Sequence, residues 1–326
     1  MQEKGIGSWR EAFYASPGPT SLKKAGILLL KGLCMGSADV IPGVSGGTIA
    51  LITGIYEKLI QALKSFDASM VKKVVNLDLR GALAGVHARF LLCLFAGIGI
   101  AIISFARLMN YLLNHHPVLT WSLFFGLIAA SIVVVSRQVA IWTAAAGINF
   151  VIGAVVAVFI VNLIPMSTPD ALWFIFLSGI IAICAMILPG ISGAFILLIL
   201  GKYEFITATL KNPFEPQNLI IIIVFCLGCL IGLLSFARVL NYLLTHFRTL
   251  TLAFLAGLMA GSIKKIWPWK EIVQTKVIGG KSLVIWGGNI LPEALNSEVW
   301  EALGLAIIGF IAVLIIERLA RSKKSD

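Results

Sequence analysis

Long apolar segments separated by short polar ones occupy most of this 326-residue chain. An α-helix rises about 1.5 Å per residue, so about 20 apolar residues are needed to cross a hydrocarbon core of about 30 Å. Apolar segments close to that length lie at residues 89–113, 118–136, 139–163, 218–245, 249–263 and 299–317. The pattern predicts an all-α polytopic membrane protein.

Four shorter apolar segments form two pairs, and each pair is interrupted by proline and glycine. The first pair lies at 25–40 and 46–62, and the second lies at 171–188 and 194–208. None of these segments is long enough to span a membrane as a straight helix. Each pair is therefore predicted to be re-entrant, so that the chain enters and leaves the membrane on the same side.

The two halves of the sequence resemble each other. IPGVSGGTIALITGIYE at 41–57 matches LPGISGAFILLILGKYE at 188–204, and SFARLMNYLLNHH, beginning at Ser104, matches SFARVLNYLLTHF, beginning at Ser235. Shared Pro, Arg, Asn and Glu residues are not explained by apolar composition, so the chain is interpreted as two copies of one unit. One re-entrant pair and three full spans make an odd number of crossings. The two repeats are therefore predicted to have inverted topologies.

These patterns divide the chain into four parts. They are a cytoplasmic N-terminal segment (1–24), a first membrane repeat (25–163), a second membrane repeat (164–320) and a cytoplasmic tail (321–326). Within the second repeat, residues 264–298 carry several lysines and β-like runs such as VIGGKSLVIWGGNI. We expect this segment to be an external cap or hairpin.

Composition supports a membrane location. Hydrophobic residues make up 59% of the chain and charged residues 13%, whereas soluble domains contain about 25% charged residues. This composition excludes a soluble enzyme, a disordered chain and a secreted disulfide scaffold. The net charge of +11 at pH 7 is typical of loops that face anionic lipid, and binding of nucleic acid is not expected. Lysine and arginine gather near both ends of the chain, which predicts cytoplasmic termini.

The repeated P-G-x-S-G motif is the first candidate site. A helix that begins at the serine exposes unpaired N–H groups and about half a positive charge, and glycine lets a ligand approach this backbone. Two such helix ends meeting at one place would bind an anion. The alternative is that Ser-Gly only caps a kinked helix. The candidate residues are Gly43, Ser45, Gly46, Gly47, Gly190, Ser192 and Gly193.

Arg107 and Arg238 are the second candidate site. Each lies near the end of a long apolar helix, and an arginine inside a membrane is costly and usually functional. Asn110 and Asn241 follow three residues later, on the same helix face. Because the two repeats are predicted to be inverted, one arginine would lie in the outer half of the membrane and the other in the inner half. An anionic substrate could then meet an arginine on either side. The alternative is an arginine that snorkels to the surface and sets the depth of its helix.

Three carboxylates are candidates for ion coupling. Asp39 lies just before the first break, and the matching residue in the second repeat is Met186. An ionisable group that is present in only one of the two repeats suits a coupling-ion site better than a symmetric substrate site. A buried carboxylate can take up a proton on one side of the membrane and release it on the other. Glu57 and Glu204 are further candidates or, alternatively, interfacial residues, and Lys31 is a supporting cation. No metal-binding motif is present in the sequence.

The segment GSADVIPGVSGGTIALITGIYEKLI and its second copy ILPGISGAFILLILGKYEFI resemble the bacterial polyprenyl-phosphate transporter family, the undecaprenyl phosphate translocases. The resemblance covers essentially the whole chain. It implies a multi-pass protein of the bacterial plasma (inner) membrane that returns undecaprenyl phosphate, the lipid carrier of cell-wall precursors, to the cytoplasmic leaflet. The implied partner is this lipid, within a membrane of other lipids. The candidate carboxylates add a coupling proton or sodium ion, and no cofactor is expected.

Two other functions are compatible with parts of the same sequence pattern. The P-G-x-S element also resembles undecaprenyl pyrophosphate phosphatases, whose motif continues Ser-Arg-Ser. Here Gly46 follows Ser45 and Gly193 follows Ser192, so the arginine that would steady a transferring phosphoryl group is missing and the chain is predicted not to be an enzyme. The third hypothesis is an ion-coupled exporter of a small anion. For the lipid transporter, rocking of one repeat against the other would alternate access to the site.

Overall fold

The computed structural model describes residues 8–40, 45–163, 168–210, 212–278, 281–292 and 294–322. Six helices in this part of the chain are long and apolar enough to cross a membrane. They are α7 (Ala88–His115), α8 (Pro117–Ser136), α9 (Ala144–Val161), α13 (Pro216–His246), α14 (Arg248–Ser262) together with the short helix η1 (Ile263–Ile266) that continues it, and α15 (Ser297–Ser322). All six coincide with segments predicted from the apolar pattern, and the prediction of an all-α polytopic membrane protein is confirmed at this level.

Each pair of shorter segments folds as three helices rather than two. They are α2 (Leu22–Asp39), α3 (Gly46–Ile52) and α4 (Tyr56–Lys64) in the first repeat, and α10 (Leu172–Ile187), α11 (Gly193–Ile199) and α12 (Tyr203–Thr209) in the second. The helices beginning at Gly46 and Gly193 start within one residue of the predicted positions. The prediction that each continues unbroken, over 46–62 and 194–208, is wrong.

Glycine causes the additional interruption. Gly54 and Gly201 have φ angles of +70° and +63°, in the left-handed region where a Cβ atom would clash. The next residue closes the helix end in both repeats. The Ile55 N–H donates at 2.9 Å to the carbonyl five residues earlier, and the Lys202 N–H does the same at 2.8 Å. This hydrogen-bond pattern, with glycine at its bend, ends an α-helix.

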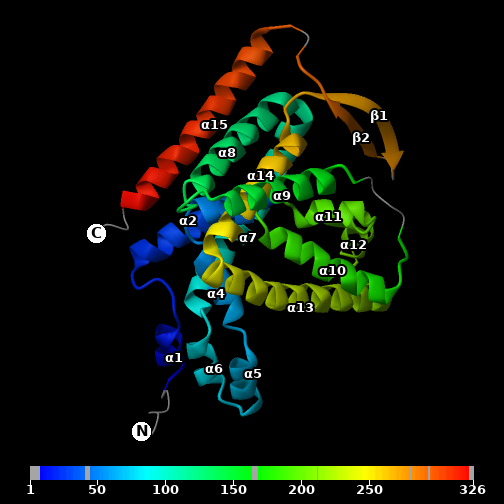
Figure 1. The fold of residues 1–326 in the computed structure, drawn as a ribbon. Coiled ribbons are helices and arrows are strands. Elements are labelled where there is room, and N and C mark those ends of the chain that lie inside the picture. Colours follow the sequence, from blue (N-terminus) through cyan, green and yellow to red (C-terminus); the bar gives the residue numbers. More distant parts are fainter. Residues whose placement is uncertain are drawn as a thin grey trace.

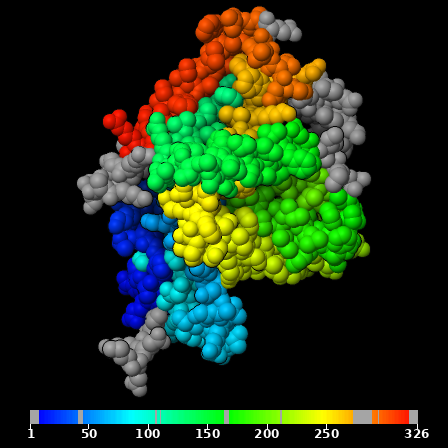
Figure 2. Space-filling model, in the orientation of Figure 1, coloured from blue at the N-terminus to red at the C-terminus, as the bar shows by residue number. Residues whose placement is uncertain are grey.

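The helices pack mainly in four pairs, and two of these pairs join the repeats. α2 packs along α7 in the first repeat, and α10 packs along α13 in the second. The other two pairs combine one helix from each repeat, α8 with α15 and α9 with α14 (Figure 1). In the space-filling view, the green surface of α9 lies directly on the yellow surface of α14 (Figure 2). We call α8, α9, α14 and α15 the exchanged bundle.

Glycine lets the paired helices approach closely. A Cβ atom on Gly126 of α8 would lie 1.9 Å from the carbonyl oxygen of Ala306 on α15, and one on Gly257 of α14 would lie 2.0 Å from that of Phe150 on α9. Small residues are common where membrane helices pack, because they bring the two backbones together. Large apolar side chains cover the outward faces, among them Ile103, Phe159 and Ile311.

Two smaller parts lie at opposite ends of the molecule (Figure 1). α1 (Trp9–Ala15), α5 (Ala68–Val75) and α6 (Leu79–Gly85) project at one end. At the other end, after the short helix η1 (Ile263–Ile266), strand β1 (Lys270–Ile278) pairs antiparallel with β2 (Lys281–Asn289). The segment between α14 and α15 therefore contains a β-hairpin. Its location outside the cell stays a prediction.

Candidate functional site

The two chain breaks identified from the repeat lie against each other. We call them the break segments. They comprise residues 45–48 and 188–193. The Ser45 hydroxyl donates to the Leu188 carbonyl at 3.2 Å, and the Gly190 N–H donates to Thr48 Oγ1 at 3.1 Å. Both hydrogen bonds run from one repeat to the other, so the fold assembles the two motifs into one place.

Both helices after the breaks begin at the motif serine. Ser45 is the N-cap of α3, and its hydroxyl accepts from the Gly47 N–H at 3.1 Å. Ser192 is the N-cap of α11, but its side chain makes no capping hydrogen bond. Both serines are buried, with 1% and 8% of their surface exposed. The fully buried Tyr56 adds a further bond between the repeats, from its hydroxyl to the last carbonyl of α10 at 3.1 Å.

Asp39, the last residue of α2, lies over the beginning of α3. Its Oδ1 accepts from the Gly46 N–H at 2.7 Å. A Cβ atom on Gly46 would lie 2.5 Å from the other carboxylate oxygen. The carboxylate therefore stabilises the positive end of this short helix. It also occupies the Gly46 N–H, one of the donors that the sequence predicts for an anionic ligand. Met186, at the matching position in the second repeat, has no group that could do the same.

The motif glycines allow the break segments to pack. Cβ atoms on Gly47 and Gly193 would each lie 2.7 Å from a carbonyl oxygen of α10. Gly190 has a φ of +89°, and a Cβ atom there would lie 2.9 Å from the backbone of α14. Gly43 lies outside the described residues. Close backbone packing thus accounts for three of these glycines in this structure, and their role in binding an anion stays a prediction.

The two arginines do not join the break segments in this structure. Arg238 donates to the carbonyl one turn earlier in α13 at 2.8 Å, and to Phe66 O, between α4 and α5, at 2.7 Å. Arg107 is exposed on α7. Among the described residues, no hydrogen bond links either guanidinium to the break segments. Asn241 is half-buried, and the side chain of Asn110 lies outside the described part of the chain.

The two glutamates are exposed rather than buried. Glu57 forms an ion pair with Arg248 at 2.8 Å, at the first turn of α4. Glu204 occupies the first turn of α12. Their exposure is typical of interfacial residues, and Asp39 is the most enclosed of the three candidate carboxylates. Lys31 donates to the Thr53 carbonyl at the end of α3, at 2.6 Å.

Sequence reasoning missed an ion pair in the second repeat between a buried lysine and an exposed aspartate. Lys202 is only 1% exposed, and its ammonium lies 2.5 Å from the Asp170 carboxylate and 2.9 Å from the Thr168 carbonyl. It also faces the ring of Phe174, with 5.6 Å between the nitrogen and the ring centroid. The first repeat has Ile55 at this position. That change from an apolar to a charged residue within a repeated motif was the available signal.

Two further lysines contact aromatic rings near the hairpin. The Lys265 nitrogen lies 4.4 Å from the Phe195 ring centroid, and the Lys270 nitrogen lies 4.4 Å from that of Trp121. Such cation–π contacts stabilise an ammonium that has lost part of its hydration. Burial, and secondarily the charge of Lys265, lower the pKa of Lys270 from 10.5 to about 8.

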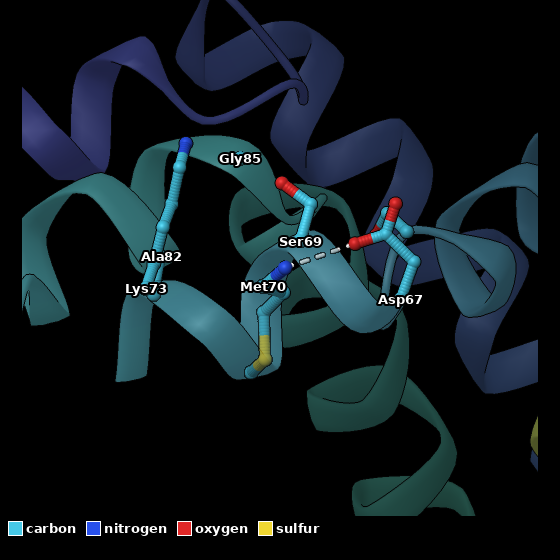
Figure 3. A pocket seen from close by; sticks show the side chains of 7 residues that line it. Asp67, Ser69, Met70, Lys73, Ala82 and Gly85 are labelled. Carbon is cyan, nitrogen blue, oxygen red and sulfur yellow. Dashed lines mark hydrogen bonds between the residues drawn. The ribbon is translucent and has the colours of Figure 1, made fainter. Parts of the chain in front are cut away.

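A small polar cavity of about 180 Å³ lies beside α5 and α6, and Figure 3 shows the residues that line it. Asp67 caps α5 there by accepting from the Met70 N–H at 2.9 Å. Lys73 donates to the Gly81 carbonyl at 3.4 Å. The charged side chains around this cavity thus bond to the backbone of α5 and α6, and we assign them to local packing.

Comparison with known proteins gives consistent matches. Residues 35–282 match a family model described as VCA0040-like, undecaprenyl phosphate translocase-like. A polyprenyl-phosphate transporter of Vibrio cholerae serotype O1 is 41% identical over 291 residues, which cover 88% of this chain and 93% of that protein. A polyprenyl-phosphate transporter of Staphylococcus aureus is 27% identical over 315 residues, which cover 90% and 96%. No solved structure matches the chain.

Proposed function

Because the chain belongs to the undecaprenyl phosphate translocase-like family, we propose that it moves undecaprenyl phosphate from the outer to the cytoplasmic leaflet of the bacterial plasma membrane. The observation that carries this proposal is the contact between the two buried break segments in a protein with six candidate spans. Curated relatives are named as transporters, in keeping with transport without chemical conversion. Inverted repeats and re-entrant helices are part of the proposal.

The head-group phosphate would bind at the break segments, to the groups offered by Gly43, Ser45, Gly46, Gly47, Gly190, Ser192 and Gly193. The Asp39 carboxylate already accepts from the Gly46 N–H. Two negative charges about 4 Å apart repel each other by about 1 kcal/mol in water and about 4 kcal/mol near a protein surface. Phosphate would therefore bind here when Asp39 is protonated or has moved away, which links substrate binding to proton uptake.

Arg107 and Arg238 would receive the phosphate before and after it occupies the break segments. Both guanidinium groups are exposed on long apolar helices, and neither forms an ion pair among the described residues. An arginine fork matches two phosphate oxygens at once. The prenyl chain would stay in lipid while the head group passes from one arginine to the other.

A coupling ion would supply the driving force. Moving one elementary charge across 100 mV is worth about 2.3 kcal/mol, so one or two cations that travel with the lipid would bias an anion inward. Asp39 is the first choice for the proton carrier because it is partly buried and lies at the break segments. Glu57 and Glu204 come after it because both are exposed.

The exchanged bundle restricts how the repeats can move. α8 is held to α15 and α9 is held to α14, so rocking the first repeat against the second would break both interfaces. Motion of the α2–α7 and α10–α13 pairs against the exchanged bundle would keep them intact. We therefore favour these two peripheral pairs as the moving bodies for alternating access.

Transport into proteoliposomes tests the proposed function. Purified protein is reconstituted with undecaprenyl phosphate, and the lipid exposed on the outer surface is measured with a membrane-impermeant probe, with and without a pH gradient. The expected result is faster, gradient-dependent loss of exposed lipid compared with protein-free vesicles. Release of inorganic phosphate would indicate a phosphatase instead, and uptake of inorganic phosphate without lipid movement would indicate a small-anion carrier. In cells, depletion of the protein should increase the undecaprenyl phosphate exposed outside.

A further inference from the structure

A second cavity, of about 560 Å³, lies away from the break segments. Its walls come from residues 17–20, the first part of α2, α4 and the start of α7. Ligand sites for small molecules have volumes of about 300–1,000 Å³. The cavity is therefore large enough for a phosphate group and a short length of attached chain.

The lining of this cavity is basic. Lys24 and Lys31 of α2 and Lys58 of α4 line it, and no aspartate or glutamate among the described residues does. The Lys24 ammonium is held at 3.3 Å by the Thr20 hydroxyl. Three cations around one cavity repel each other, and an anion bound between them would relieve that repulsion.

The same lining also contains apolar side chains. They are Ile27, Leu28, Ile55 and Phe90, and three of these, Leu28, Ile55 and Phe90, are at least 93% buried. A free inorganic ion would leave these apolar side chains in contact with water. A molecule with an anionic group and an apolar chain would cover them and pair with the lysines as well.

A histidine with a buried ring nitrogen is a second, independent observation at this cavity. His87 lines the cavity, and its Nδ1 atom is buried without a hydrogen-bond partner among the described residues. An unpaired buried polar atom costs about 1–3 kcal/mol, and a ligand oxygen or hydroxyl would satisfy it. Burial also lowers the pKa of His87, which favours the neutral ring.

Lys31 connects this cavity to the break segments. Its ammonium donates at 2.6 Å to the Thr53 carbonyl, at the end of α3. Ser45 lies at the other end of α3. A helix of seven residues is about 10 Å long, so the cavity lies about one short helix away from the break segments.

We propose that this cavity binds a lipid phosphate, with the phosphate between Lys24, Lys31 and Lys58 and the start of the chain against Ile27, Leu28 and Phe90. It is a second head-group site, distinct from the break segments. Only the identity of the lipid as a polyprenyl phosphate rests on the proposed function. A phospholipid with a phosphate head group has the same chemistry and could bind the same cavity.

Binding of farnesyl phosphate to the full-length protein in detergent tests this site. The test variant is Lys24→Gln with Lys58→Gln. The matched control is Lys23→Gln with Lys64→Gln, which removes two exposed lysines from the same helices outside the cavity. Exposed charge pairs contribute about 0.2–1 kcal/mol each, so the test variant should bind about two- to thirtyfold more weakly while the control binds like the wild type.

Competing ligands distinguish a prenyl phosphate, a phospholipid and free inorganic phosphate as occupants of the cavity. Farnesyl phosphate should compete at least about tenfold better than inorganic phosphate or farnesol, since only it contacts both the lysines and the apolar side chains. Displacement by phosphatidic acid as effective as that by farnesyl phosphate would identify a general lipid-phosphate site. Equal weakening in test and control variants, or equal binding of inorganic phosphate, would overturn the proposal.

Transport measured in proteoliposomes distinguishes failure of the cavity proposal from failure of the proposed transport function. If the test variant loses binding in the cavity but transports at the wild-type rate, the second site has no part in transport and the proposed function stands. If wild-type protein binds farnesyl phosphate through these lysines but moves no prenyl phosphate, the cavity stands and the proposed function fails.

Discussion

Replacing Asp39 with asparagine tests whether its charge matters separately from its shape. The asparagine side chain would keep Oδ1, which can still accept from the Gly46 N–H, 2.7 Å from the carboxylate oxygen in the wild type. A hydrogen bond to a charged group contributes about 1.5–3 kcal/mol, and a neutral one contributes about 0.5–1.5 kcal/mol. We therefore expect Asp39→Asn to lose about 1 kcal/mol of stability. Asp39→Ala removes the acceptor and should lose about 1–3 kcal/mol more than Asp39→Asn.

The functional effect of Asp39→Asn should be larger than its effect on stability. The amide mimics a carboxylate that is always protonated, so the anionic competitor at the Gly46 N–H is gone. We expect the variant to bind farnesyl phosphate at least as well as the wild type. It should no longer accumulate undecaprenyl phosphate on one side, because no proton can be released. Its transport should not respond to a change in external pH.

Three measurements check this prediction. Thermal unfolding in detergent compares the two Asp39 variants, ligand binding reports the competition, and proteoliposome transport at several pH values reports coupling. Asp78→Asn serves as a control, since Asp78 also accepts from a glycine N–H at the start of a helix, at 2.9 Å from Gly81, but is exposed and lies outside the break segments. Wild-type transport with unchanged pH dependence in Asp39→Asn would refute the coupling role. Weaker lipid binding by Asp39→Asn would refute the competition between carboxylate and phosphate.

Three further predictions concern the arginines, the topology and the hairpin. Arg107→Ala and Arg238→Ala should each reduce transport about tenfold or more at near-normal protein abundance, since a charge-assisted bond to phosphate is worth about 1.5–3 kcal/mol. Replacing either arginine with lysine should restore little transport. Loss of folded protein in the alanine variants would favour a structural role. Single cysteines at Lys72 and Asn212 should be labelled only from the cytoplasm and only from outside, respectively; labelling from the same side would exclude inverted repeats. Because the pKa of Lys270 is about 8 when folded and 10.5 when unfolded, the unfolded chain binds more protons between these values. Stability should therefore rise with pH from 8 to 10.5 in the wild type but not in Lys270→Met, as measured by thermal unfolding at about pH 7.5 and 10.

The long helices and the meeting of the two motifs could be predicted from the sequence. Span length follows from membrane thickness and from the apolar pattern, so the bounds of α8, Pro117–Ser136, agree closely with the predicted 118–136. The repeated motif indicated that Ser45 and Ser192 begin helices, because serine is a favoured N-cap residue. The capping chemistry of serine determines where the short helices begin, and the thickness of the membrane determines how long the spanning helices are.

Contacts between distant segments could not be predicted in this way. The bond from Arg238 to Phe66 and the ion pair of Lys202 with Asp170 depend on which helices become neighbours. Gly54 was visible within the repeated motif, but its positive φ follows from the helix end that forms around it. A glycine inside an apolar run is compatible with both a continuous and an interrupted helix.

Pairing of α8 with α15 has a consequence for the order in which the protein assembles during synthesis. About 160 residues separate the end of α8 from the start of α15. At a synthesis rate of roughly 5–20 residues per second, α8 waits roughly 8–32 seconds for its partner after it has been made. During that interval the face around Gly126, shaped for the backbone of α15, has only lipid or another membrane protein against it. Completion of the first repeat thus depends on the last helix of the chain, and a truncation before α15 should leave both repeats unfinished.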